Sequence, residues 1–144
     1  MARYSAGMTA AGAGTTVRPI LGVLATASST PQLREIGLFN TTAVACTYRL
    51  VQVTGGTPGA TVTAFEHRAN GPAALCLAKQ LWTADATVNS DTGYRIVLGA
   101  AIGSAAILTF GEHGVAPAVG ATIALGLVPV GTGQVCEVYI VWDE

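Results

Sequence analysis

Apolar and polar residues alternate along much of this chain with a period of two, the spacing typical of β-strands. The clearest example is residues 44–53, in which Val44, Cys46, Tyr48 and Leu50 fall on one face of an extended chain. Thr47 and Arg49 fall on the other face, because successive side chains of a strand point to opposite sides. We therefore predict a half-buried strand here, with its Tyr48 side facing a core.

Other segments are also extended in character, and clusters of glycine, proline and small polar residues separate them. These segments are residues 17–25, 32–39, 60–66, 94–98, 105–110, 122–128 and 135–142. Residues 40–42 read as a turn, and residues 55–59 and 85–93 read as loops. Turn signals spaced about 8–12 residues apart are typical of a sandwich or barrel rather than of alternating strands and helices. The pattern predicts an all-β, single-domain antiparallel sandwich that is jelly-roll-like.

Two segments do not fit the strand pattern. Residues 73–82 are rich in helix-forming side chains, with Leu77 and Leu81 four positions apart, so they form either a short helix or a strand followed by a bulge. Residues 1–14 are mostly small and show no regular period. We expect them to form a short flexible N-terminal arm, either frayed or ordered against a neighbouring subunit, ahead of a β-sandwich domain over residues 15–144.

The composition points to partners. Of the 144 residues, 51% are apolar and 10% are charged, whereas a soluble domain usually carries about 25% charged residues. So few charges leave apolar surface that contact with other subunits would bury. The net charge is −1 and no basic stripe is present, so we expect no nucleic-acid binding. Prolines and glycines interrupt the long uncharged stretch at residues 114–136, and the N-terminus has no compact apolar segment, so we expect no membrane span and folding in a cytoplasm.

The residues suited to chemistry are scattered. Cys46, Cys76 and Cys136 are far apart and unpaired in spacing, so we expect buried, small hydrophobic side chains rather than a zinc site. His67 lies between Glu66 and Arg68, and in a strand it would face away from both of them. His113 lies in an expected turn, where a pH-sensitive contact is conceivable but a plain surface turn is favoured. Motifs for nucleotide, metal or nucleophilic chemistry are missing, so we predict no cofactor and no enzymatic activity.

Trp82 and Trp142 allow two interpretations. As lone aromatics in apolar stretches they are typical of core or interface anchors. Exposed beside polar groups, they would instead suit stacking on sugars.

Three segments carry a resemblance to a known class of proteins. They are residues 1–7 (MARYSAG), 33–42 (LREIGLFNTT) and 131–144 (GTGQVCEVYIVWDE). These segments resemble small virion proteins of tailed bacteriophages, especially those of actinobacterial hosts. The resemblance covers both ends of the chain and leaves about residues 57–91 unmatched.

The resemblance implies a structural role in a virion assembled in the bacterial host cytoplasm. Such proteins are similar to capsid decoration proteins, which are often trimeric and bind the major capsid protein of the shell. They are also similar to minor tail components, and the alternative is therefore a tail or fibre protein that contacts the host surface. The resemblance places candidate interface residues in the matched segments, namely Arg3, Tyr4, Arg34, Glu35, Phe39 and Trp142.

Overall fold

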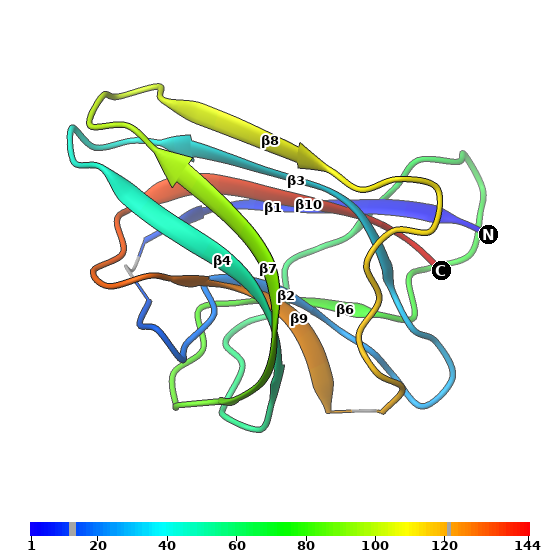
Figure 1. The fold of residues 1–144 in the computed structure, drawn as a ribbon. Helices are drawn as coiled ribbons and strands as arrows, with labels where there is room; N and C mark the ends of the chain where they lie inside the picture. The colour runs from blue at the N-terminus through cyan, green and yellow to red at the C-terminus, as the bar shows by residue number, and fades with distance from the viewer. Residues whose placement is uncertain (12–13, 121) are drawn as a thin grey trace.

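The computed structural model describes residues 1–11, 14–120 and 122–144. These residues form two antiparallel sheets of five strands each, packed face to face (Figure 1). The strands are β1 (Arg3–Ala10), β2 (Leu21–Leu24), β3 (Gln32–Asn40), β4 (Cys46–Thr54), β5 (Phe65–Glu66), β6 (Leu77–Gln80), β7 (Thr87–Leu98), β8 (Ala105–Thr109), β9 (Ile123–Pro129) and β10 (Cys136–Asp143). The predicted all-β antiparallel sandwich is confirmed. The described residues contain no apolar helix of membrane-spanning length.

The strand order is that of a jelly roll. The upper sheet of Figure 1 has the order β5-β1-β10-β3-β8, and the lower sheet has the order β6-β2-β9-β4-β7. Strands pair in a nested series, β1 with β10, β2 with β9, β3 with β8 and β4 with β7, as in a long hairpin rolled across two layers. The connection between β4 and β7 supplies β5 and β6, which extend one edge of each sheet.

The core lies between the two sheets and follows the period-two pattern. In β10, Val138, Ile140 and Trp142 are buried. Glu137, which lies between Cys136 and Val138, is exposed. The predicted inward face of β4 is confirmed for Cys46, Tyr48 and Leu50, which are buried. Val44 was placed on the same face, but it lies before the start of the strand and is 50% exposed. Burial of alternate side chains from both sheets is the main source of stability in such a sandwich.

The N-terminal residues form a strand instead of the expected flexible arm. Arg3–Ala10 is β1, and it pairs with β10 along its whole length. The prediction was wrong because the side chains of this segment are small and show no strand pattern. In the structure, small residues let β1 lie close to the side chains of β10: a Cβ added to Gly7 would lie 3.1 Å from the Cβ of Tyr139. The strand is held by its ladder of hydrogen bonds to β10 rather than by bulky side chains. Residues 12–13 of the expected arm lie outside the described residues.

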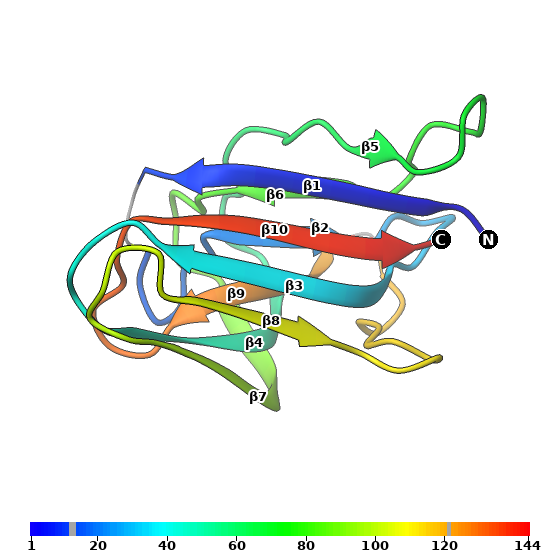
Figure 2. The ribbon, with the colours of Figure 1, turned by 90° about the horizontal axis from the view of Figure 1, so that it is seen from above.

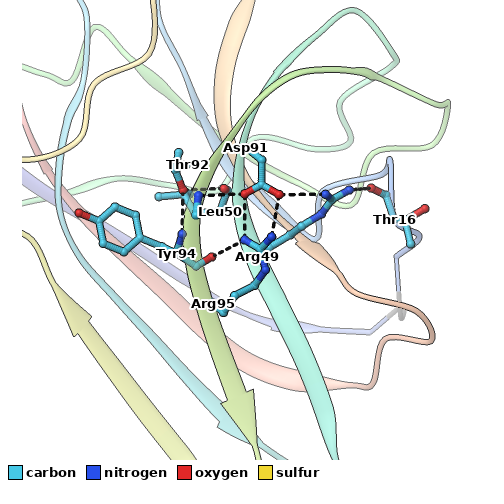
Figure 3. A network of polar contacts seen from close by, with 8 residues as sticks. Thr16, Arg49, Leu50, Asp91, Thr92, Tyr94 and Arg95 are labelled. Atoms are coloured by element: carbon cyan, nitrogen blue, oxygen red, sulfur yellow. Dashed lines mark hydrogen bonds and ion pairs between the residues drawn. The ribbon is translucent and has the colours of Figure 1, made fainter.

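The polar segment at residues 85–93 was expected to be a loop, but most of it belongs to the long strand β7. Its turn-forming residues are accommodated by register shifts opposite β4 and by a positive φ of 84° at Gly93. Asp91 accepts hydrogen bonds from Arg95, from the N–H of Gly93 and from Arg49 across the strand pair (Figure 3). These contacts, chiefly the one from Arg95, hold the pKa of Asp91 well below its usual range.

Residues 73–82 contain a strand rather than a helix. Leu77–Gln80 is β6, which pairs with β2, and the strand ends where Leu81 adopts a φ of 38°. Residues 60–62 run along its other side, since the Val62 N–H donates to the Ala78 carbonyl over 2.9 Å. The helical propensity of this segment is overridden by hydrogen bonds to distant residues, which a local pattern cannot reveal.

Candidate interaction surface

No other segment of the described chain covers the outer face of the upper sheet (Figure 2). Figure 2 looks directly onto it, with β1, β10, β3 and β8 side by side in front of the lower sheet. One row of residues crosses all four strands in register: Gly7, Tyr139, Gly37 and Ile107. The rows on either side of it carry two charged residues, Glu35 and Glu137, and are otherwise uncharged. The face therefore offers contact area with few charges. We call it the upper face.

Tyr139 and Phe39 form a fixed aromatic pair at the centre of the upper face. The Tyr139 ring lies over Gly37, where an added Cβ would come within 2.0 Å of the ring. Its hydroxyl donates to Glu35 over 2.6 Å, and the Phe39 ring stacks on it at 6.2 Å between centroids. Desolvation by burial, followed by the hydrogen bond to Glu35, raises the pKa of Tyr139 to about 12. Gly37 is therefore needed for space, because any larger side chain would displace the tyrosine.

A buried ion cluster lies at one margin of the upper face, where the two chain ends meet. Asp143 is 5% exposed and accepts from Arg3 at 2.7 and 3.0 Å and from Arg34 at 2.7 Å. These hydrogen bonds, that from Arg3 first, lower the pKa of Asp143. Arg34 also donates to the carbonyls of Gly111 and Glu112, which fixes the segment after β8. Both arginines thus hold β1, β3 and β10 together, and only Arg3 is half-exposed.

Over β2, β9 and β4 the outer face of the lower sheet is covered by the chain itself, whereas on β7 the outward-facing Val97 is 68% exposed. Trp82 lies on this face, packed in a separate apolar cluster with Val51, Val53, Ala86, Ala124 and Val128. It sits over Gly22, where an added Cβ would lie 3.1 Å from the indole ring. Pro19 covers Gly126 in the same way, at 2.8 Å from an added Cβ. In Figure 1 the covering segments lie below the lower sheet. This covered area is the lower face.

A small pocket remains on the lower face beside Trp82. It is a cavity of about 130 Å³, lined mainly by apolar groups such as Leu24, Val53 and Ala124. The indole N–H of Trp82 is buried and has no hydrogen-bond partner among the described residues. The pocket is the size of a very small apolar ligand or a few waters, and no charged residue lines it.

Asn40 organises the loops at one end of the sandwich. It is 1% exposed, and its amide donates to the carbonyls of Val44 (2.8 Å) and Gly99 (2.9 Å), which lie in different loops. Its carbonyl oxygen accepts from the N–H and hydroxyl of Thr42, both at 3.0 Å. The sequence predicted only a turn at residues 40–42, because a buried bridge between distant loops leaves no local signal.

The candidate interface residues fall into three groups. Tyr4 and Trp142 are core residues: both are almost fully buried, and their rings stack at 5.8 Å. Because they are opposite each other in the β1–β10 register, both side chains lie on the same side of the sheet, and their burial shows that this side faces the core. Glu35 and Phe39 lie on the upper face, while the Arg3 and Arg34 side chains reach the ion cluster at its margin. Their role in an interface stays a prediction.

Sequence reasoning did not identify Tyr139, Gly37 and Ile107 as residues that form the upper face. The sequence does contain a pattern that indicates Tyr139: Glu137, Tyr139 and Val141 alternate with the buried residues of β10, so they lie on its outer side. Gly37 and Ile107 had none, since their importance comes from lying beside Tyr139 across two different strand pairs.

The cysteines are free and buried, as predicted. Desolvation by burial raises the pKa of Cys76 to about 12 and that of Cys136 to about 11, so both thiols stay protonated near neutral pH. Tyr48 lies next to Cys136, and its hydroxyl donates to the Gln134 carbonyl over 2.6 Å. Within the described ranges no cluster of histidine, cysteine and acidic side chains has the arrangement of a metal site.

Comparison with known proteins adds no assignment. No protein-family model matches the sequence, and no curated protein or solved structure matches this chain. The interpretation of its function therefore rests on the fold and on the contrast between its upper and lower faces.

Proposed function

We propose that this chain is a bacteriophage virion structural protein, a capsid decoration protein that binds the assembled head through its upper face. The observation that carries the proposal is the difference between the two outer sheet faces. The lower face is closed by Trp82 and its neighbours, whereas the upper face is left open with a fixed aromatic pair at its centre. An ordered, weakly charged face of this kind suits contact with a large, rigid protein lattice.

Two further features support this role. Only 10% of the residues are charged, which favours contact area over electrostatic steering in binding. The β1–β10 pairing also extends beyond the two strands, since Ala2 and Glu144 exchange two backbone hydrogen bonds of 2.8 and 3.0 Å. A subunit of this kind stabilises a shell by mass action, because it binds the assembled state.

The alternative is a tail or fibre component that contacts the host surface. Stacking on host sugars through Trp82 or Trp142 would need those side chains to be exposed, but Trp82 is 5% exposed and Trp142 is fully buried. The structure therefore favours the shell as the partner over host sugars bound by these two residues.

The test combines localisation with a matched pair of variants. Cryo-electron microscopy of purified particles is expected to show regular copies of the protein on the head, with the upper face toward the shell. Thr9→Lys places a charge on the upper face, and Thr87→Lys places the same charge on an exposed position of β7. Shells lacking the protein should bind Thr87→Lys normally and Thr9→Lys weakly. Copies confined to the tail, or equal binding of both variants, would overturn the proposal.

A further inference from the structure

The sandwich has four sheet edges, and they differ in how well they are protected. The edge strands are β5 and β8 in the upper sheet and β6 and β7 in the lower sheet. An edge strand presents unpaired backbone N–H and C=O groups, which can pair with a strand of another chain. Proteins usually prevent this with short strands, charges, bulges or covering segments.

The β7 edge is protected by charge and by irregular geometry. Asp91, Arg95 and the neighbouring Arg49 form its polar network, and Gly93 has a positive φ within the strand (Figure 3). The register of β7 against β4 shifts twice along this stretch. A strand that is bulged and charged in this way is a poor template for further pairing.

The edges at β6 and β5 are protected by other means. Residues 60–62 cover β6, with hydrogen bonds from the Val62 N–H to Ala78 (2.9 Å) and from the Gln80 N–H to Ala60 (3.1 Å). β5 is only two residues long, and its charged Glu66 is followed by Arg68. Neither edge therefore offers a free strand of useful length.

The β8 edge has none of these protections. Ala105–Thr109 contains no charged residue, proline or glycine, and its pairing with β3 is regular. The flanking bonds, Phe110 N–H to Arg34 (2.8 Å) and Asn40 N–H to Ser104 (2.7 Å), fix which backbone groups face β3. By the alternation of an antiparallel ladder, the N–H and C=O groups of residues 105, 107 and 109 point away from β3, into the open edge.

We propose that β8 is a self-association edge, at which β8 of a second copy pairs antiparallel to form a two-fold dimer. Ile107 lies at the centre of the strand and would face its own counterpart, and Ala105 would face Thr109 of the second copy. A two-fold axis places identical surfaces together, so an uncharged strand avoids the like-charge pairs that a charged one would create. Ile107 is 57% exposed, and the contact would bury part of that side chain.

The geometry of this pairing has a consequence for the upper face. Two antiparallel copies of one edge strand are related by an axis perpendicular to the sheet. The upper sheets would therefore join into one continuous sheet, with both upper faces pointing in the same direction. Such a dimer could attach to a lattice at two places, which strengthens binding without new kinds of contact. The dimer differs from the trimer that the phage resemblance implies, and it does not depend on the capsid role.

The test uses the purified full-length protein without any shell. Ile107→Lys puts like charges opposite each other across the axis, and Val119→Lys is the control at an exposed loop position. Equilibrium sedimentation should show a dimer for the wild type and for Val119→Lys. We expect Ile107→Lys to raise the dissociation constant by about a hundredfold, since like charges placed together at an interface are strongly unfavourable.

Amide hydrogen exchange identifies the edge that is used. In the wild-type dimer the amides of residues 105, 107 and 109 should be protected, and in Ile107→Lys they should exchange freely. The amides of Ala106 and Leu108 bond to β3 and should stay protected in both proteins, which shows that the variant is folded. A monomeric or trimeric wild type, a dimer that survives Ile107→Lys, or unprotected amides at 105, 107 and 109 would each overturn the proposal.

Discussion

The upper and lower faces are both outer surfaces of five-stranded sheets in one sandwich, but other segments of the described chain cover only the lower face. On the lower face, Trp82 and Pro19 cover glycine positions and exclude water from a second apolar cluster. On the upper face, Tyr139 covers Gly37 in a similar way, yet no other segment of the described chain lies over it (Figure 2). An aromatic ring therefore lies over a glycine on both faces. On the lower face Trp82 is buried in an apolar cluster, whereas on the upper face Tyr139 remains at the surface.

This contrast indicates that the two faces contribute differently to the stability of the fold and to its exposed contact area. The lower face contributes to stability, because its apolar groups are removed from water by the chain itself. The upper face keeps contact area available for a partner, and its few charges are already hydrogen-bonded to neighbours. Substitutions that are matched across the two faces should therefore differ in their effect on folding and binding.

The largest expected effect comes from truncating the aromatic residue of each face. Trp82→Ala should lower the free energy of unfolding by about 3–5 kcal/mol, because it leaves a cavity in the lower cluster. Tyr139→Ala should cost about 1–2 kcal/mol, since its half-exposed ring loses less burial and one hydrogen bond. Denaturant titration of both variants measures the difference. Equal losses would mean that the two faces are not distinct in the way described.

The second prediction tests whether the charges beside the upper face are structural. Asp143→Asn should cost about 2–3 kcal/mol at neutral pH, because it leaves Arg34 without its nearby carboxylate while half-exposed Arg3 is partly solvated. The folded-state pKa of Asp143 is lowered, so its contribution is present above the unfolded value of about 3.9 and is lost as the pH falls through the folded value.

The pH dependence supplies the control for that variant. The difference in unfolding free energy between wild type and Asp143→Asn should be constant near neutrality and should shrink below about pH 4. The carboxylate of Asp91 also has a lowered pKa, but both proteins contain it, so its effect cancels in the difference. A difference that does not change with pH would contradict the role given to Asp143.

A smaller effect is expected from the hydroxyl of Tyr139. Tyr139→Phe removes its hydrogen bond to Glu35 and should cost about 1 kcal/mol. Because the folded pKa of Tyr139 is raised to about 12, its contribution is complete below the unfolded value of about 10 and is lost as the pH rises toward 12. Urea unfolding at pH 8 and pH 11 should show a wild-type advantage that is smaller at the higher pH. An advantage that grows with pH would be inconsistent with this geometry.

The smallest expected effect concerns the pair of lysine variants used for shell binding. Thr9→Lys and Thr87→Lys should each change the free energy of unfolding by less than about 0.5 kcal/mol, since both sites are exposed. In Thr9→Lys the introduced ammonium can replace the exposed hydrogen bond that the Thr9 hydroxyl donates to Glu137. Thermal melts of the two proteins should nearly coincide. If so, weak shell binding by Thr9→Lys reports on the upper face and not on folding; a clear loss of stability in one of them would break this comparison.

Much of the fold could be predicted from the sequence. The alternation around Tyr48 identified β4 and its buried side, and the segments at residues 32–39 and 105–110 lie within one residue of β3 and β8. The failures share one cause. β1 was read as an arm because its residues are small, and β7 was read in part as a loop because Asp91 and Gly93 favour turns. In both strands the stabilising contacts come from distant residues, which local propensity does not record.

The candidate surface was less predictable than the fold. Glu35 and Phe39 were placed in an interface and do lie on the upper face, but Tyr4 and Trp142 are in the core. A strand pattern gives two faces without saying which is inside when both carry aromatic residues. The pairing of β1 with β10 puts Tyr4 and Trp142 on the same side of the upper sheet, and the packing of the lower sheet against that side makes it the core.

The sequence by itself determined the all-β class, the two-layer arrangement, the buried cysteines and a low content of charged residues. These properties follow from composition and from period-two alternation, which are local and additive. Only the tertiary structure decided which sheet face is covered, which edge strand is unprotected and which groups form hydrogen bonds with Asn40, Asp91 and Asp143. Those outcomes depend on contacts between residues far apart in the chain, where register and strand order, rather than local preference, place each side chain.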